Sequence, residues 1–382
     1  MTIYLDHAAT TPLHPRVCEA MQPYLKEHYG NPSSIHSLGR AARSAVEGAR
    51  DVIAAFLGAR PNQLVFTSGG TEADNLAIIG AAFANRQRGR HLITSQAEHH
   101  AVLNSCEFLE QNGFEVTYLP VDETGMVRLA DLEQALRPDT ILVSIMWANN
   151  EVGTIQPIEA IGRLLRDRRI LFHTDAVQAF GLLPIDVSRL PVDLLSASAH
   201  KINGPKGVGL LYVAAGVKLS PILFGGAQER NRRAGTENVA GIVGMAEAVK
   251  LAHAEMEQRR NHYAKLRQAM IETWRAAEIP FVVNGHPDQH LPHILNVSFP
   301  GTDTETMLFN LDLAGIAAAS GSACSSGSLE VSHVLRAMCL DESRSGSAIR
   351  FSFGLGNTLD EVRQAAEKTA EIAKQLAGQT SR

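Results

Sequence analysis

The chain has 382 residues, of which 45% are hydrophobic and 20% charged, and this is the composition of a folded globular protein rather than a disordered one. Its 35 basic and 40 acidic residues give a formal net charge of −5, without the basic excess that is typical of proteins binding nucleic acid or anionic membranes. Its four cysteines are too few for a disulfide framework, and no apolar stretch reaches the ~20 residues that cross a bilayer. The opening residues do not resemble a signal peptide. We therefore expect a soluble, reduced, cytoplasmic protein.

Short runs rich in β-branched residues alternate with helical patterns through the first part of the chain. The predicted strands are residues 64–67, 91–95, 115–119, 141–146, 170–174, 193–197 and 208–213. Between the first two, apolar residues recur at the spacing of one helix face within residues 71–86. This alternation predicts an α/β fold with a mostly parallel, seven-stranded sheet that is flanked by helices.

The pattern changes after about Asn238. Residues 239–274 predict one long helix with a charged middle, and beyond it shorter strands (294–299, 349–353) mix with helices (304–313, 329–338, 359–375). We therefore predict a large α/β domain over residues 15–250. A smaller α+β domain would consist of residues 1–14 and 251–382, with the first dozen residues crossing over to pack near the functional site.

Polar residues follow several of the predicted strands, and the carboxyl ends of parallel strands meet at one edge of a sheet, where ligands bind. After the first strand comes SGGTEADN, a glycine-rich turn that opens a helix and offers backbone N–H groups to an anion. Two more predicted strands are followed by polar residues at this edge. Asp175 and Gln178 follow the strand at 170–174, and Ser198, His200 and Lys201 follow the strand at 193–197. An anion cradle, a carboxylate and a lysine together suit a phosphorylated cofactor with a protonated ring nitrogen.

Each of these features also has an ordinary explanation. A Gly-Gly-Thr turn is usually only a turn, Asp175 could cap a helix, and a loop lysine such as Lys201 is normally a solvated charge; their joint placement at one edge favours the site. His99 and His100 fall on the same edge, but adjacent side chains point in different directions, so we expect at most one of them to act. Their spacing does not match the zinc-binding pattern His-Glu-x-x-His, and we expect no intrinsic metal site.

One cysteine differs from the other three in its surroundings. Cys324 lies in SGSACSSGS, where seven of nine residues are Ser or Gly, so we expect a mobile loop with an accessible thiol that can be deprotonated. Cys18, Cys106 and Cys339 lie in helical or apolar patterns, and we expect them to be buried and inert.

Six segments of the chain, in the same order, resemble the cysteine desulfurases, a class V branch of the fold-type-I enzymes that use pyridoxal 5′-phosphate. They are YLDHAATTP (4–12), GNPSSIHSLGR (30–40), HTDAVQ (173–178), SASAHKINGPKGVG (196–209), RRAGTEN (232–238) and SSGSLEVSHVLRAM (325–338). The resemblance extends from about residue 3 to residue 353. It implies the fold-type-I transferase architecture for the predicted large and small domains.

The resemblance also implies a role for each matched residue. Lys201 would form the Schiff base with the cofactor, Asp175 would pair with its ring nitrogen, and His99 would stack on the ring and take part in proton transfer. Gln178 would bond the 3′-oxygen of the ring, with Asn150 nearby on the substrate side. The phosphate would be held by Gly70, Thr71, Ser198 and His200, together with Thr236 from a second subunit. Arg350 would bind the substrate carboxylate, a task suited to the planar fork of arginine, and Cys324 would be the nucleophile.

The implied function is a sulfurtransferase reaction, in which L-cysteine gives L-alanine and a persulfide on Cys324. The implied partners are a second copy of the chain and sulfur acceptors such as an iron–sulfur scaffold protein or a tRNA-thiolating enzyme, without direct binding of nucleic acid or membranes. With a scaffold partner, Cys324 could transiently ligate an iron–sulfur cluster. The alternatives are a selenocysteine or cystine lyase on the same scaffold, and a non-catalytic sulfur-assembly protein.

Overall fold

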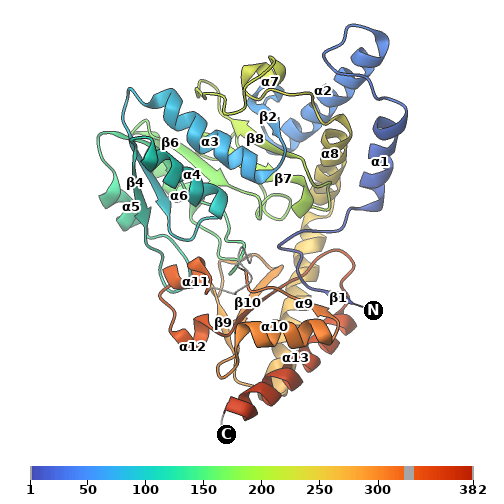
Figure 1. Ribbon diagram of the computed structural model, residues 1–382, viewed down its shortest axis with the longest axis vertical. Helices are drawn as coiled ribbons and strands as arrows, with labels where there is room; N and C mark the ends of the chain where they lie inside the picture. Colours follow the sequence, from blue (N-terminus) through green and yellow to red (C-terminus); the bar gives the residue numbers. More distant parts are fainter. Residues whose placement is uncertain (1, 322–330, 381–382) are drawn as a thin grey trace.

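The computed structural model describes residues 2–321 and 331–380, and its two parts are stacked along the long axis of the molecule (Figure 1). The upper part contains a large sheet between helices, and the lower part contains two small sheets beside the last long helix. Within the described residues, no helix is both long and apolar enough to span a membrane.

The large sheet has seven strands in the order β2-β8-β7-β6-β5-β3-β4. These are β2 (Leu64–Thr67), β3 (His91–Ser95), β4 (Glu115–Leu119), β5 (Thr140–Ser144), β6 (Leu171–Asp175), β7 (Leu194–Ser198) and β8 (Gly209–Val213). Strands β7, β6, β5, β3 and β4 pair in parallel, whereas β8 runs antiparallel to both of its neighbours. The predicted mostly parallel, seven-stranded sheet is therefore confirmed, and the strand bounds differ from the prediction by at most two residues.

Both faces of this sheet are buried, which explains the continuous apolar runs of its strands. In β2, Leu64 and Phe66 pack into one core cluster and Val65 into another, because successive side chains of a strand point to opposite faces. The helices of this part are α1 (Pro15–Lys26), α2 (Ser37–Leu57), α3 (Gly70–Asn85), α4 (His100–Gln111), α5 (Leu129–Ala135), α6 (Ile158–Arg166), α7 (Gln228–Asn231) and α8 (Val239–Ala254). Residues of α3 and α4 cover one face of the sheet, and residues of α2, α6 and α8 cover the other.

The single long helix predicted over residues 239–274 is instead two helices, α8 and α9 (Met256–Ala276), separated at Glu255. The backbone of Glu255 leaves the helical region, and its carboxylate accepts hydrogen bonds from Arg259 Nε at 3.0 Å and Nη2 at 2.9 Å. The two helices serve different cores, because α8 packs on α1 and α2 whereas α9 packs on α13 (Leu359–Thr380). Figure 1 shows α9 following α8 from the upper part of the molecule into the lower part.

The lower part is built around Trp274, which is fully buried against Phe299 and Phe351. Its strands are β9 (Val282–Asn284), β10 (Ile294–Ser298) and β12 (Ala348–Ser352) in one antiparallel sheet, and β1 (Ile3–Tyr4) with β11 (Ile316–Ala317) in a parallel pair. Its remaining helices are α10 (Thr304–Leu313), α11 (His333–Ala337) and α12 (Glu342–Ser345). The first residues thus pair with the C-terminal third through β1 and β11, while the division into a domain of residues 15–250 and one of residues 1–14 and 251–382 stays a prediction.

The expectation that Cys18 and Cys339 are buried is wrong, whereas Cys106 is buried. Cys18 follows Val17, the one buried residue of α1, and points to the solvent side of that helix. Cys339 follows α11 in the left-handed backbone region (φ 54°), which ends the helix and turns the side chain outward. Apolar neighbours in the sequence therefore did not determine burial at these two positions.

Candidate active site

A cavity of about 470 Å³ lies beyond the carboxyl ends of the parallel strands, between the large sheet, the N-terminal segment and the β12 region. Ten of the twelve predicted site residues line it: Gly70, Thr71, His99, Asn150, Asp175, Gln178, Ser198, His200, Lys201 and Arg350. Thr236 is exposed between α7 and α8 and does not line this cavity, so its contact with a cofactor stays a prediction about a second subunit. Cys324 lies outside the described residues.

Lys201 ends the short 3₁₀ turn Ala199–Lys201 that directly follows β7. Its Nζ donates hydrogen bonds to the carbonyl oxygens of Ala8 at 2.5 Å and Ala9 at 2.8 Å, so the N-terminal segment forms one wall of the site. Burial, followed by the nearby Arg350 charge, lowers the pKa of this amine to about 8. An amine with such a pKa is partly neutral near pH 7 and can act as a nucleophile or a base.

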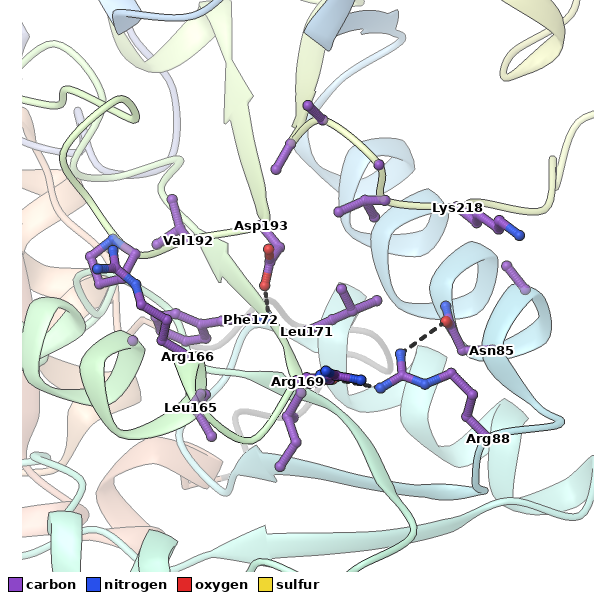
Figure 2. Close-up of a pocket in the computed structure, with 18 of the residues that line it drawn as sticks. Asn85, Arg88, Leu165, Arg166, Arg169, Leu171, Phe172, Val192, Asp193 and Lys218 are labelled. Atoms are coloured by element: carbon purple, nitrogen blue, oxygen red, sulfur yellow. Dashed lines mark hydrogen bonds between the residues drawn. The ribbon is translucent and has the colours of Figure 1, made fainter.

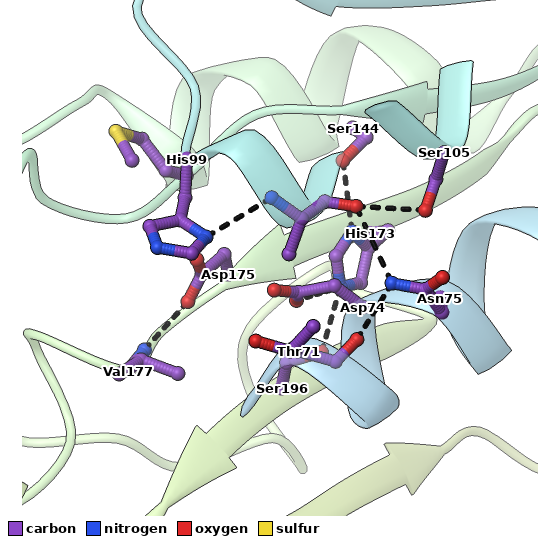
Figure 3. Close-up of polar contacts among 12 residues, drawn as sticks. Thr71, Asp74, Asn75, His99, Ser105, Ser144, His173, Asp175, Val177 and Ser196 are labelled. Carbon is purple, nitrogen blue, oxygen red and sulfur yellow. Dashed lines mark hydrogen bonds and ion pairs between the residues drawn. The ribbon is translucent and has the colours of Figure 1, made fainter. Parts of the chain in front are cut away.

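Asp175 is the last residue of β6, and it is buried and lines the cavity. Figure 3 shows its carboxylate beside His99 and Val177. Burial raises the pKa of this group, while the neighbouring His99 and Lys201 act in the opposite direction. One carboxylate oxygen, Oδ1, accepts a hydrogen bond from the Val177 N–H at 2.8 Å. This bond fixes the direction in which the carboxylate faces a ligand.

His99 is the N-cap residue of α4, and its Nδ1 accepts a hydrogen bond from the Ala101 N–H at 3.1 Å (Figure 3). Burial lowers the pKa of the imidazole below its usual 6.5, so the ring is neutral at pH 7. Because Nδ1 accepts, the proton of the neutral ring is on Nε2. His100, the adjacent residue, instead contacts the ring of His333 and does not line the cavity.

An anion-binding cradle lies where α3 begins after β2. The N-terminal turn of a helix offers unpaired backbone N–H groups, and here Gly70 and Thr71 occupy that turn. A Cβ at Gly70 would lie 2.7 Å from Val177 Cγ2, so a larger residue there would require the Val177 side chain to shift. The buried Ser198 Oγ has no hydrogen-bond partner within the described chain, and it also faces this cavity. An orphaned hydroxyl beside a helix N-terminus fits a phosphate group.

Arg350, in β12, joins the lower part of the molecule to the site. Its Nη2 donates to Asp6 Oδ1 at 2.8 Å and its Nη1 to the Asn150 carbonyl oxygen at 2.9 Å, while the buried Nε has no partner within the described chain. Gln178 is held from the other side, since its Nε2 donates to the Ala8 carbonyl oxygen at 2.9 Å. A guanidinium fixed in this way can bind a substrate carboxylate in the cavity.

The sequence reasoning missed two acidic residues of the site. Asp6 pairs with Arg350, and the only signal for it was the opening segment in which it lies. Asp74 is buried and also lines the cavity, with Oδ1 3.6 Å from His173 Nε2 (Figure 3). Asp74 follows Gly70 by four residues in a helix otherwise rich in Ala, Leu and Ile, and that spacing places it on the same face of α3 as the cradle.

His173 connects this buried carboxylate to two hydroxyls. Its Nδ1 lies 2.8 Å from Ser144 Oγ and its Nε2 lies 3.0 Å from Ser196 Oγ. Burial lowers the pKa of the imidazole to about 3 and raises that of the Asp74 carboxyl, with the Asp175 charge adding to the latter shift. The neutral His173 and its partners therefore form a polar layer directly beneath the cavity.

Residues 3–364 match the family described as aminotransferase class-V. Cysteine desulfurase IscS of Methanosarcina thermophila is 52% identical over 375 residues, covering 98% of this chain and 92% of that protein. A solved NifS-like protein is 40% identical with a TM-score of 0.92, covering 98% of this chain and 100% of that one. The structure of SspA in complex with cysteine is also 40% identical, with a TM-score of 0.81 and coverage of 92% and 99%.

Proposed function

The chain belongs to the cysteine desulfurases of the aminotransferase class-V family, which depend on pyridoxal 5′-phosphate, and on this premise we propose that it transfers the sulfur of L-cysteine to Cys324 as a persulfide and releases L-alanine. The observation that carries the proposal is the convergence of Lys201, Asp175 and Arg350 on one cavity. These three side chains supply an amine, a carboxylate and a guanidinium, which the reaction needs in one place.

The residues of the cavity fit the cofactor. Gly70, Thr71, Ser198 and His200 would hold its phosphate, and Asp175 would keep its ring nitrogen protonated. His99 would lie against the ring, and Gln178 would bond its 3′-oxygen. When bound, the cofactor supplies a protonated aromatic ring that withdraws electrons from the α-carbon of the substrate.

The side chains of this protein then perform the remaining tasks. Arg350 binds the carboxylate of L-cysteine, with Asn150 beside it, and this orients the α-carbon toward Lys201. The Lys201 amine, whose pKa of about 8 leaves part of it neutral, removes the α-proton at Nζ. The neutral His99 offers its Nε2 proton at the same end of the cavity and helps to move protons during the reaction.

Cys324 enters at the cleavage of the carbon–sulfur bond. Its thiolate attacks the sulfur of the bound cysteine, so that a sulfur–sulfur bond forms as the carbon–sulfur bond breaks. The carbon that loses sulfur takes up a proton, and the product leaves as L-alanine. The persulfide on Cys324 then passes its outer sulfur to an acceptor protein.

We further propose that the enzyme is a cytoplasmic homodimer whose sites are shared, with Thr236 of each chain completing the phosphate site of the other. Thr236 is exposed and does not line the cavity of its own chain, which leaves it free to reach the site of a second subunit. Mixing Lys201→Ala protein with Thr236→Ala protein tests this. Exchanged heterodimers should regain activity in one of their two sites, and no recovery despite verified exchange would refute the sharing.

The names of the relatives favour delivery of sulfur to iron–sulfur cluster assembly, and tRNA thiolation is a second proposed destination. In the first case the acceptor would be a scaffold protein, with which Cys324 could transiently ligate a cluster. A transfer assay with labelled persulfide against candidate acceptors distinguishes the two destinations.

Single-turnover release of alanine by a Cys324→Ser variant tests the mechanism. A serine hydroxyl is hardly ionised at neutral pH, so this variant should bind the cofactor and cysteine but release no alanine. Cys339→Ser is the matched control, because Cys339 is an exposed cysteine that does not line the cavity, and it should behave as the wild type. Release by Cys324→Ser at the wild-type rate would instead support a lyase that frees the sulfur species directly.

A further inference from the structure

A strained backbone segment lies close to the anion-binding cradle. Within α7, Glu229, Arg230 and Asn231 have φ of 44°, 59° and 63°, so three consecutive residues that are not glycine occupy the left-handed region. Such conformations are costly, and they persist where surrounding contacts enforce them, most often near functional sites. Figure 1 shows α7 beside β2, the strand that precedes the cradle.

This segment contacts the chain on both sides of the glycine-rich turn that forms the cradle. Before the turn, Glu229 Oε2 accepts the N–H of Phe66 in β2 at 3.0 Å. After the turn, Arg233 Nε donates to Glu72 Oε1 at 2.7 Å, and its Nη2 donates to Oε2 at 3.2 Å. Glu72 Oε2 also accepts the N–H of Ser68 at 2.8 Å. Arg233 is therefore bonded to the carboxylate that closes the turn.

The pairing of Arg233 differs from that of an ordinary surface arginine. Arg88 is exposed at a hollow of about 1190 Å³ away from the active-site cavity, and it donates to Asn85 Oδ1 at 3.4 Å and to the Arg169 carbonyl oxygen at 2.6 Å (Figure 2). Its partners there are neutral. The Arg233 and Glu72 side chains are only 20% and 15% exposed, and two parallel bonds to a carboxylate hold the guanidinium in one orientation.

Glu72 places a negative charge in the turn that would hold a phosphate. It is the third residue of α3, and because the first turn of a helix favours anions, a carboxylate there repels a second anion. Burial acts to raise the pKa of the Glu72 carboxyl, but the hydrogen bonds from Arg233 and Ser68 hold this pKa below its usual 4.5, so the charge is present at neutral pH. The Arg233 guanidinium cancels this charge beside the cradle.

We propose that Arg233 is a positioning residue for the phosphate of the cofactor, which neutralises Glu72 and holds the turn of residues 68–72 in its binding conformation. This inference rests on the proposed function, since it takes the cradle as the phosphate site of pyridoxal 5′-phosphate. Arg233 does not line the cavity, so it acts through Glu72 and not by contact with the phosphate. The left-handed residues of α7 then have a reason, because they bring Arg233 to Glu72 only four positions after Glu229 is bonded to β2.

Titration of the full-chain apoprotein with pyridoxal 5′-phosphate, and with pyridoxal, which lacks the phosphate, tests this proposal by absorbance. Arg233→Gln leaves Glu72 charged beside the cradle, so it should weaken binding of pyridoxal 5′-phosphate about tenfold. Pyridoxal should bind equally to the variant and the wild type, because it carries no charge for Glu72 to repel.

Equal affinity of Arg233→Gln and the wild type for pyridoxal 5′-phosphate, or an equal loss for pyridoxal, would overturn the role of Arg233 while leaving the proposed function intact. A wild type that binds no pyridoxal 5′-phosphate would refute the proposed function and this role together.

Variants of Glu72 separate the effect of charge from that of structure. Glu72→Gln breaks the ion pair as completely as Arg233→Gln does, but it removes the negative charge, so affinity for pyridoxal 5′-phosphate should fall by no more than about twofold. The double variant Glu72→Gln/Arg233→Gln has neither charge and should bind within about threefold of the wild type. An ion pair with a merely structural role would weaken both single variants alike and leave the double variant no better, and that result would overturn the proposal.

The matched control is Arg232→Gln, which removes a positive charge from the same segment. Arg232 Nη1 donates to the Asn62 carbonyl oxygen at 3.4 Å, so this variant leaves the pair of Arg233 and Glu72 in place. Affinity for pyridoxal 5′-phosphate should change by about twofold at most. Equal weakening by Arg232→Gln and Arg233→Gln would assign the effect to the general charge of the segment and refute the pairing.

Discussion

The buried ion pair of Arg50 and Glu229 gives a quantitative prediction about stability. Their side chains are each 3% exposed, and Arg50 Nη2 lies 2.6 Å from Glu229 Oε1 while Nη1 lies 2.9 Å from Oε2. Glu229 Oε2 also accepts the N–H of Phe66 at 3.0 Å, and the Arg50 guanidinium lies 4.6 Å from the centre of the Phe66 ring. The pair therefore joins α2, β2 and the segment before Thr236.

The perturbation is Glu229→Gln, which keeps the size of the side chain and an oxygen for the Phe66 N–H but removes the negative charge. The buried Arg50 guanidinium then keeps only the half-exposed Glu47, 3.2 Å from its Nε, as a counter-charge, and breaking a buried pair such as Arg50–Glu229 costs ~3–5 kcal/mol. Because the glutamine still accepts hydrogen bonds, we expect the lower end, about 3 kcal/mol. The control is Glu159→Gln, whose partner Arg163 is 69% exposed, and it should cost about 0.5 kcal/mol or less.

Urea unfolding of the two holoenzyme variants and the wild type, at one protein concentration and followed by circular dichroism, measures both costs. The Glu229→Gln midpoint should fall markedly with an unchanged slope, and the Glu159→Gln midpoint should stay near the wild type. Equal midpoints for the two variants, or a loss below about 1 kcal/mol for Glu229→Gln, would show that burial does not govern this pair.

Two further predictions concern pH. Because burial lowers the pKa of Lys201 to about 8, the apoprotein should bind pyridoxal phosphate about tenfold faster at pH 9 than at pH 7. Stopped-flow absorbance measures this rate. A midpoint of the rate–pH curve near pH 10.5 would contradict the assigned role of burial. Burial raises the pKa of Glu98 from its usual 4.5 to about 8, so between these values the folded protein holds a proton that the unfolded chain has lost, and stability falls as pH rises through this window. Urea unfolding midpoints at pH 5, 6.5 and 8 measure this loss of stability, and they should change less with pH in Glu98→Gln than in the wild type. An equal change of the midpoint with pH in both proteins would reject the explanation.

The sequence alone was sufficient for the large sheet and for most of the active-site lining. Runs of β-branched residues and the 3.6-residue spacing of helix faces are local properties, and they predicted the strands to within two residues. The rule that parallel strands end at one edge then brought Thr71, Asp175 and Lys201 together before any tertiary contact was known.

Only the tertiary structure showed which distant residues complete the site. Asp6 pairs with Arg350 across 344 positions of sequence, and the Ala8 carbonyl accepts from Lys201 across 193. The break at Glu255 and the exposure of Cys18 were likewise absent from the sequence reasoning. The physical reason is that periodicity specifies the face of an element that is buried, whereas the partner that meets this face depends on how the whole chain packs.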